Sequence, residues 1–347
     1  MEQNSRVRTG EKLLEGLWQV YHDDLPPILL DLAATPPMQR LKDVGMNCGC
    51  EYTAYDCFSR LLRYSRYTHS VGVGLIVWHF THDAAQAAAG LLHDIATPTF
   101  AHVVDFLHGD YLTQEATEDG TRQRIEQSRE IQAVLGRYGL CTEDVCDYHR
   151  YPIADNDSPR LSADRLEYTL GNVLNFHLGT PAEAAALYRA LTVAENEDGL
   201  PELAFSDAAS ALRFARIALD CAEVYVRDED RYAMQMLAEL LRDAMAAGAL
   251  REQDLTGTES DLIETLCKAP EWRRRWAEFR SLHDLETSRT PKGAGWRCVD
   301  AKRRCIDPLI AGQGRVSACF PDFGARMQAF RTRRLDHWVR EKRPAAE

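Results

Sequence analysis

The sequence predicts a mostly α-helical protein that ends in a small strand-containing appendix. Helical spacing of apolar residues dominates 181–247, and an alanine-rich run at 83–92 is typical of a buried helix. No earlier stretch shows the sustained alternation of apolar and polar side chains that marks a half-buried strand. We therefore expect residues 1–270 to form a helical domain and residues 271–347 to form a basic appendix.

Prolines and polar caps mark the expected helices of the first part. A proline pair precedes the apolar segment 28–32, and Thr35 with two prolines precedes 38–44. Apolar residues at helical spacing then predict a helix at 69–80, followed by the alanine-rich one. Within the helix at 69–80, Gly72 and a second glycine two residues later have no side chain, so another helix can approach closely.

Longer helices are expected further along the chain. Residues 125–138 have helical spacing, and Ser162 is a suitable cap for the helix that follows it. The longest helical patterns cover 207–223 and 230–247. Gly248 directly follows the second, where glycine commonly ends a helix.

The appendix differs from the body in pattern and in charge. Residues 296–308 show a loose alternation of apolar and polar side chains and are bounded by glycines and a proline, which predicts a strand, and 312–320 is a second strand candidate. Residues 271–347 carry a net charge of +8, whereas the preceding residues carry −20. We expect the appendix to dock on the acidic body rather than to bind nucleic acid, and we expect any anion site in that body to need local arginines or a metal.

Composition also bears on the compartment. The ten cysteines lack the paired short spacing of zinc ribbons, so we interpret them as reduced thiols of a cytoplasmic protein. No apolar run approaches the length that crosses a bilayer, and no apolar signal region stands at the N-terminus, so we expect no membrane association.

Chemistry is concentrated at the end of the alanine-rich helix, where His93 and Asp94 are adjacent. An imidazole nitrogen and a carboxylate oxygen are ligands for divalent ions, although a histidine at a helix end beside a capping aspartate is the simpler interpretation of the pair alone. His69 at one helix start and Asp164 at another are the further ligand candidates. Two nitrogens and two oxygens would leave coordination positions open for water and substrate, as catalytic sites require.

Four segments, in order, resemble the motifs of the HD-domain metal-dependent phosphohydrolases, and of their deoxynucleoside triphosphate triphosphohydrolase branch in particular. Residues 35–41 resemble TPxFQRL, residues 66–73 resemble RFxHSLGV, residues 92–102 resemble LHDIGHxPFSH and residues 164–168 resemble D[KR]xDY. The resemblance covers roughly residues 30 to 267. It implies an HD-domain helical bundle and a phosphorylated small molecule, most directly a nucleotide, as substrate.

The resemblance also implies roles for single residues. The expected metal ligands are His69, His93, Asp94 and Asp164; the expected catalytic residues are His102 and Asp94; and the expected substrate contacts are Gln39, Arg66, Arg165 and Tyr168. The ion is divalent, and manganese, iron, zinc, nickel and magnesium are not distinguished. From the residues alone, His102 could also be an ordinary core or surface histidine. Arg66 could be a solvated arginine in an arginine-rich run, and Arg165 could simply pair with Glu167 or another acid.

Three positions depart from the branch. Thr97 replaces a histidine, Ile125 stands where a histidine is usual, and Asn172 replaces an aspartate. All four expected metal ligands are present, whereas two of the histidines expected near the scissile phosphate are missing. Three functions therefore stay open. They are hydrolysis of a (deoxy)nucleoside triphosphate or related nucleotide, hydrolysis of a phosphomonoester, and regulatory binding of a metal or nucleotide without catalysis. The sequence leaves the oligomeric state open, with a homo-oligomer as one option.

Overall fold

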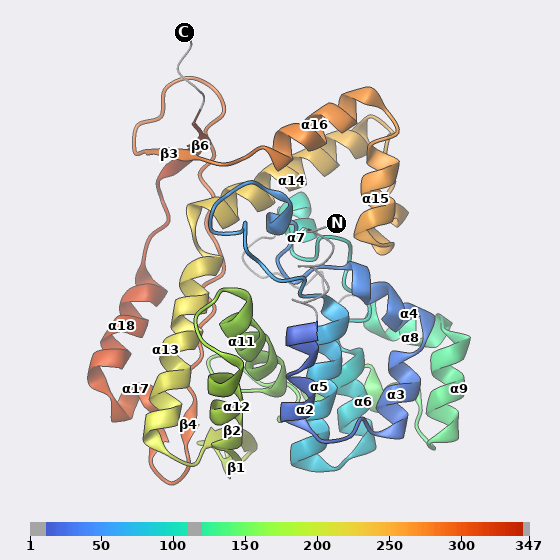
Figure 1. Cartoon of the computed structure of the whole chain (residues 1–347), viewed down its shortest axis with the longest axis vertical. Helices are drawn as coiled ribbons and strands as arrows, with labels where there is room; N and C mark the ends of the chain where they lie inside the picture. The colour runs from blue at the N-terminus through green and yellow to red at the C-terminus, as the bar shows by residue number, and fades with distance from the viewer. Residues whose placement is uncertain (1–11, 110–119, 343–347) are drawn as a thin grey trace.

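Helices account for most of the secondary structure in the computed structural model, which describes residues 12–109 and 120–342 (Figure 1). The α-helices are α2 (Trp18–Tyr21), α3 (Pro27–Ala33), α4 (Pro36–Arg40), α5 (Arg66–Thr81), α6 (Ala84–Leu92), α7 (Val103–His108), α8 (Thr121–Gln127), α9 (Arg129–Arg137), α10 (Thr142–Val145), α11 (Ala163–Asn175), α12 (Pro181–Arg189), α13 (Ala208–Tyr225), α14 (Asp228–Ala246), α15 (Glu259–Leu266), α16 (Pro270–Arg280), α17 (Val316–Cys319) and α18 (Pro321–Thr332). The mostly α prediction is confirmed.

Six short strands accompany the helices in the described part of the chain. They are β1 (Leu191–Glu195), β2 (Pro201–Phe205), β3 (Leu285–Ser288), β4 (Leu309–Ile310), β5 (Gly314–Arg315) and β6 (Trp338–Glu341). One sheet has the order β1-β2-β4-β5, with β2 and β4 parallel and the other neighbours antiparallel; β3 and β6 form a separate antiparallel pair. The first sheet therefore joins a hairpin of the body to the C-terminal part.

Helices α5 and α6 pack side by side at the centre of the lower half of Figure 1. Glycines make this close approach possible. A Cβ on Gly74 would lie 3.1 Å from the Leu91 side chain, and one on Gly90 would lie 3.1 Å from Val77. Polar caps fix where both helices begin, because Ser65 accepts from the backbone of α5 and Asp83 from that of α6. The predicted close approach of another helix is confirmed at Gly74, and Gly90 adds a second close contact that was not predicted.

Within residues 12–109 and 120–342, apolar side chains form two buried clusters. The larger includes α5, α6, α11 and α13, and the smaller includes α7, α14, α15 and α16. A cavity is lined by members of both, with Tyr148 from the larger cluster and Phe58 and Met234 from the smaller. The elements that carry the candidate site therefore come from both cores.

Four predictions of secondary structure differ from the observed elements. The body is not free of strands, since the hairpin β1–β2 forms at 191–205 around a turn that contains Gly199 at φ 74°. Residues 296–308 contain no strand and contribute only an isolated bridge from Arg297 to Val339. Residues 312–320 hold the two-residue strand β5 followed by helix α17. The expected helix at 125–138 is two helices, because Ser128 ends α8 and caps α9.

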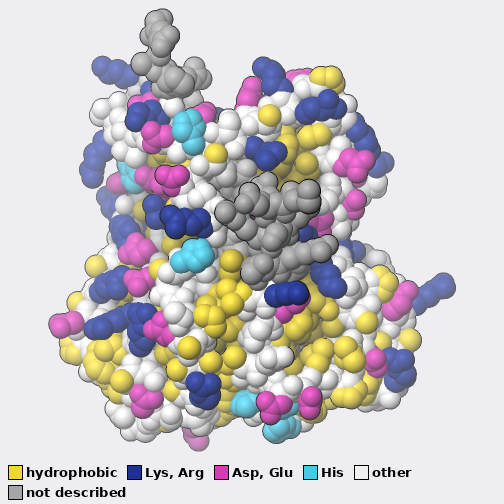
Figure 2. Space-filling model, viewed as in Figure 1, with side chains coloured by type: hydrophobic (Ala, Val, Ile, Leu, Met, Phe, Trp, Pro, Cys, Tyr) yellow, Lys and Arg dark blue, Asp and Glu magenta, His cyan; other side chains and the backbone are white. Residues whose placement is uncertain are grey.

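The C-terminal part docks on the acidic body, as its charge predicts. Ion pairs join the two parts at Arg275–Asp243, Arg297–Glu239, Arg315–Glu202, Arg326–Asp220 and Arg333–Glu223. Figure 2 shows basic and acidic side chains interspersed over the face in view. Among the described residues, no helix is long and apolar enough to cross a membrane. The domain division at residue 270 stays a prediction.

Candidate metal centre

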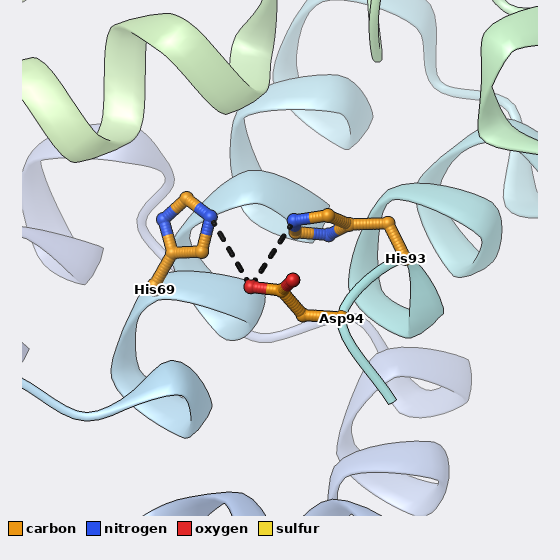
Figure 3. Close-up of side chains that lie close together, drawn as sticks. All are labelled: His69, His93 and Asp94. Carbon is orange, nitrogen blue, oxygen red and sulfur yellow. Dashed lines mark ion pairs between the residues drawn. The ribbon is translucent and has the colours of Figure 1, made fainter. Parts of the chain in front are cut away.

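Three buried side chains, His69, His93 and Asp94, have ligand atoms that all lie within 4.8 Å of one another. Figure 3 shows the two imidazole rings on either side of the Asp94 carboxylate. The Asp94 Oδ2 atom lies 3.8 Å from Nε2 of His69 and 3.5 Å from Nε2 of His93. Histidine nitrogens and a carboxylate oxygen at such spacing could hold a divalent ion.

Asp164 joins this group from helix α11. Its Oδ1 atom lies 3.0 Å from Nε2 of His69 and 3.6 Å from Nε2 of His93. Its side chain is 23% exposed, so it is the most accessible member of the group, and all four side chains line the cavity. The structure thus brings together all four residues that the sequence suggested as ligands, and the donor set of two nitrogens and two oxygens fits a catalytic divalent ion.

The second nitrogen of each ring is already engaged. Nδ1 of His69 lies 2.5 Å from Oε2 of Glu167, and Nδ1 of His93 lies 2.7 Å from the Gly90 carbonyl oxygen. Such partners fix the tautomer and orientation of metal-binding histidines. Both Nε2 atoms therefore face the common centre. Glu167 stands three residues after Asp164 on helix α11, so one helical face supplies both carboxylates.

Gly72 makes the Glu167 contact possible. A Cβ at this position would lie 2.6 Å from Cγ and 2.7 Å from Oε1 of Glu167. The hydroxyl of Tyr64 also donates to the Glu167 carboxylate, which holds it in place from another direction. Glu167 was not singled out in the sequence, although its spacing from Asp164 is a signal that could have found it.

Two further side chains fix Asp94. Nη1 of Arg66 donates to Oδ2 at 2.8 Å, and the Thr97 hydroxyl donates to Oδ1 at 2.8 Å. Burial alone would raise the pKa of Asp94, but Arg66, His93 and His69 outweigh it and hold that pKa below its usual range. Thr97, which replaces a histidine of the resembled motif, is therefore a partner of the ligand set.

The charge state of His69 follows from the same contacts. Burial lowers its pKa, but hydrogen bonds to Asp164 and Glu167 outweigh burial and raise the pKa to about 10. Without an ion, the imidazole is thus protonated between two carboxylates. A divalent ion would take the place of the proton on Nε2, because metal binding requires the deprotonated ring nitrogen.

His102 lies on the cavity wall, directly after a strained turn. Phe100 and Ala101 adopt left-handed backbone conformations with φ of 62° and 47°. Nδ1 of His102 lies 2.9 Å from Oδ2 of the buried Asp105, and Nε2 lies 3.1 Å from Nη2 of Arg304. Burial is the largest influence on its pKa and, with the nearby arginines, lowers it to about 4 against the opposing effect of Asp105.

The expected substrate contacts divide into two pairs. Arg66 and Tyr168 line the cavity, whereas Gln39 and Arg165 are not among the described residues that line it. The Gln39 amide donates to the Ala33 carbonyl, and Nη1 of Arg165 lies 3.0 Å from Oδ1 of Asp155. The substrate contacts of Gln39 and Arg165 stay predictions, and the positions of these two side chains give them no support.

The cavity itself has a volume of about 170 Å³, which is several times the space of one water and leaves room for an ion, waters and a phosphate group. Tyr148 lines it and packs its ring 5.0 Å from that of His93. Further lining residues come from elements far apart in the sequence: Asn47, Phe58, Asn172, Phe176, Tyr225, Asp230, Lys302 and Arg304. Sequence reasoning missed most of these, because no local pattern links them.

Comparison with known proteins gives related sequences and a shared fold. No family model matches the chain. It is 26% identical to "Uncharacterized protein YdhJ" of Bacillus subtilis, over 69% of this chain and 70% of that protein. It is 23% identical to "Metal-dependent phosphohydrolase cns2" of Cordyceps militaris, over 92% of each.

Two solved structures share the fold. A phosphohydrolase from Bacteroides thetaiotaomicron superposes with a TM-score of 0.63 at 14% identity, over 92% of this chain and 97% of the other. A hypothetical protein from Aquifex aeolicus superposes with a TM-score of 0.62 at 17% identity, over 91% and 92%. The chain is therefore similar in sequence to a protein named as a metal-dependent phosphohydrolase, and it shares the fold of a solved phosphohydrolase.

Proposed function

We propose that this chain is a metal-dependent phosphohydrolase whose divalent ion is held by His69, His93, Asp94 and Asp164. The observation that carries the proposal is the convergence of both Nε2 atoms and both carboxylates on one centre. Glu167 and the Gly90 carbonyl engage the opposite nitrogens. Such second partners are what oriented metal ligands require.

A divalent ion, when bound, supplies Lewis acidity and a water whose pKa is lowered to about 7. The chain supplies the remaining steps. Arg66 is buried beside Asp94 and presents a fixed positive charge to the cavity, where it offsets charge that develops on phosphate oxygens. Because Nδ1 of His102 faces the Asp105 carboxylate, Nε2 is the atom that would exchange a proton with the leaving oxygen.

We further propose that the substrate is a phosphorylated nucleotide, with a (deoxy)nucleoside triphosphate as the first candidate. The motif resemblance supports this, as does the mixed aromatic and amide lining of the cavity. Tyr168, Phe176 and Tyr225 offer ring faces and edges. Asn172 donates to the Tyr225 hydroxyl at 2.7 Å, so the lining is a connected polar network rather than an apolar wall.

A phosphomonoester is the second candidate, and specific observations favour it. The Arg165 guanidinium is engaged by Asp155, and Arg165 is not among the described residues that line the cavity, so the geometry gives little support to a triphosphate contact there. Thr97 holds Asp94 where the triphosphohydrolase motif has a histidine. The site therefore offers fewer groups for a long polyphosphate than the resembled motif implies.

The test is a panel of deoxynucleoside triphosphates, nucleoside monophosphates and simple phosphoesters, assayed with protein reconstituted with manganese, iron or zinc. Release of inorganic triphosphate supports the first substrate, and release of orthophosphate from monoesters supports the second. A His102→Ala variant should lose about 10²–10⁴ in kcat while keeping its metal. Turnover with none of the metals, alongside nucleotide-dependent shifts in melting temperature, would contradict the hydrolase and support a regulatory binding protein.

A further inference from the structure

Three asparagine side chains form a hydrogen-bonded chain beside the cavity. Asn175 is fully buried and contacts both Asn47 and Asn172, which line the cavity. Nδ2 of Asn175 donates to Oδ1 of Asn47 at 3.0 Å and to Oδ1 of Asn172 at 3.1 Å. Nδ2 of Asn172 then donates at 2.7 Å to the hydroxyl of Tyr225, a further lining residue. The amide chain thus connects the loop before α5 with the packed helices α11 and α13 (Figure 1).

One backbone amide fixes the direction of every hydrogen bond in this chain. The Leu62 N–H donates to Oδ1 of Asn175 at 2.9 Å, which identifies that atom as the oxygen. Both hydrogens of the Asn175 amide are then donated, so Asn47 and Asn172 must each present an oxygen to it. Turning over either lining amide would place two donors together in a buried site, which costs free energy. The orientation of both lining amides is therefore set before a ligand binds.

Hydrogen-bond donors are what the amide chain leaves for a ligand. Among the described residues, nothing accepts from Nδ2 of Asn47 or from the hydroxyl hydrogen of Tyr225. The side-chain oxygens of the three asparagines and of Tyr225 each accept a hydrogen bond already. Burial raises the pKa of Tyr225 well above its ordinary value, so the phenol keeps its hydrogen at neutral pH. The lining therefore presents two uncharged donors at this place.

A tight turn holds the backbone of Asn47. Its carbonyl accepts from the Cys50 amide at 3.0 Å, and Cys48 within the turn has a left-handed backbone with φ of 53°. On the other side of Asn47, the Met46 amide donates to the Tyr64 carbonyl at 2.9 Å. A left-handed residue other than glycine is uncommon and persists where its surroundings over-determine it. The backbone that carries Asn47 is thus held as firmly as its amide.

The two donors lie away from the proposed metal centre. Asn172 follows Asp164 by eight residues on helix α11, which corresponds to about 12 Å along the helix axis. A phosphate group at the metal ligands is too small to span that length, so the donors meet a different part of the substrate. The ring centre of Phe176, which also lines the cavity, lies 6.0 Å from that of Tyr225. Aromatic rings beside uncharged donors suit a flat, uncharged group.

We propose that Asn47 and Tyr225 donate hydrogen bonds to an uncharged acceptor on the base of the substrate, such as a carbonyl oxygen or a ring nitrogen. Asn175 is then a positioning residue, because it is fully buried and acts by directing the two lining amides. This inference rests on the proposed function and deepens it, since the substrate carries a heterocyclic base as well as a phosphate group.

The test measures binding of uncharged nucleosides to the full chain by saturation-transfer NMR, which detects weak binding and needs no turnover. Asn47→Ala and Tyr225→Phe should each weaken binding by about 3- to 10-fold, the range for one uncharged hydrogen bond. Tyr188→Phe is the matched control, because the Tyr188 hydroxyl donates to the Tyr21 carbonyl at 3.0 Å and Tyr188 is not among the described residues that line the cavity. It should lower the melting temperature and leave nucleoside affinity within about twofold.

Asn175→Asp reverses the direction of the amide chain. The new carboxylate can still accept from the Leu62 amide but has no hydrogen to donate, so both neighbouring amides should turn over and donate to it. Asn47 would then present its oxygen to the ligand, and the Tyr225 hydroxyl would donate to Asn172. Nucleoside affinity should fall by about 10-fold or more, although each buried polar group keeps a partner. A purely structural Asn175 would instead leave nucleoside affinity unchanged.

Separate results decide the inference and the proposed function. No nucleoside binding by the wild type, or equal affinity in wild type, Asn47→Ala and Asn175→Asp, would overturn the role of these residues whatever the turnover. Nucleoside binding that depends on them, in a protein that hydrolyses no phosphoester, would uphold the role in base binding and overturn the hydrolase.

Turnover gives the second comparison. A loss of kcat/KM in Asn47→Ala that appears in KM for deoxynucleotides, and is absent for 2-deoxyribose 5-phosphate, supports both the inference and the proposed function. The same loss on 2-deoxyribose 5-phosphate would place the two donors on the sugar and overturn their assignment to the base.

Discussion

Replacing Gly72 by alanine tests the packing that orients His69. The new Cβ would lie 2.6 Å from Cγ and 2.9 Å from Cδ of Glu167, and real Cβ atoms do not approach so closely. The carboxyl end of Glu167 is the part that can yield, but it is held 2.5 Å from Nδ1 of His69 and also accepts from the Tyr64 hydroxyl. The substitution must therefore break the orientation of His69, shift helix α11, or both.

The expected size follows from these contacts. Overpacking at a buried site lowers the free energy of unfolding by about 1–3 kcal/mol. Loss of the partner that orients a metal-binding histidine weakens metal affinity by about 10- to 100-fold. Denaturant melts of the metal-free protein give the first quantity, and competition with a chromogenic chelator gives the second. Glu167→Gln should reproduce the loss of metal affinity without the overpacking.

Gly136→Ala is the matched control. Gly136 lies in helix α9, and a Cβ there would meet no atom within 4 Å. Alanine at this position should stabilise the helix by about 0.5–1 kcal/mol and leave metal affinity unchanged. Unaltered metal affinity in Gly72→Ala would refute the reasoning. The reasoning would also fail if Gly72→Ala lowered metal affinity by the same factor in a protein that already carries Glu167→Ala, because the clash acts through the Glu167 side chain.

Three further outcomes are expected. The His102 imidazole should titrate with a pKa of about 4 by NMR, and a pKa near 6.5 would contradict the assigned surroundings. Because this pKa lies below that of the unfolded chain, the contribution of His102 to the free energy of unfolding is fully present above about pH 6.5 and is lost as the pH falls toward 4. Thr97→Val removes a donor to Asp94 with little change in shape, so metal affinity measured by chelator competition should fall by about tenfold, and no change would disprove that role. Arg315→Ala removes the ion-pair partner of the buried Glu202 and should lower the free energy of unfolding by about 3–5 kcal/mol in denaturant melts. Arg334→Ala, at an exposed position, should change it by under about 0.5 kcal/mol, and similar values for the two variants would contradict the reasoning.

The proposed ligand set could be predicted from sequence because its members lie in short, ordered motifs. His93 and Asp94 end one helix, and His69 and Asp164 each stand in the first turn of another, so local patterns locate them. Helix packing then brings the four together. Which histidine nitrogen faces the centre depends on Glu167 and on a backbone carbonyl, and only the folded structure shows these partners.

The substrate contacts were less predictable because they depend on where long side chains point. Arg165 stands beside Asp164 in the sequence, yet its guanidinium turns to Asp155 and Asn156. Gln39 likewise finds a backbone acceptor in its own neighbourhood. Adjacency to a ligand does not determine orientation, since consecutive residues on a helix point about 100° apart.

Contacts between distant segments lay beyond the reach of sequence patterns. Arg304 meets His102 across 202 positions of the chain, and no periodicity links the two. The charge imbalance did predict that the C-terminal part docks on the body, but not that it contributes to the cavity. The hairpin at 191–205 was missed because its strands have only five residues each and stand between the helices α12 and α13.

Elemental analysis of the purified protein tests the central claim most directly. The wild type, reconstituted with manganese, iron or zinc and freed of excess ion, should retain a tightly bound divalent metal. Asp94→Ala should lose that metal and all hydrolysis, because the remaining ligands surround an incomplete site. Gln39→Ala, a substitution outside the ligand set, should keep both the metal and the fold. A full metal complement in Asp94→Ala, or none in the wild type under any reconstitution, would contradict the assignment of this centre.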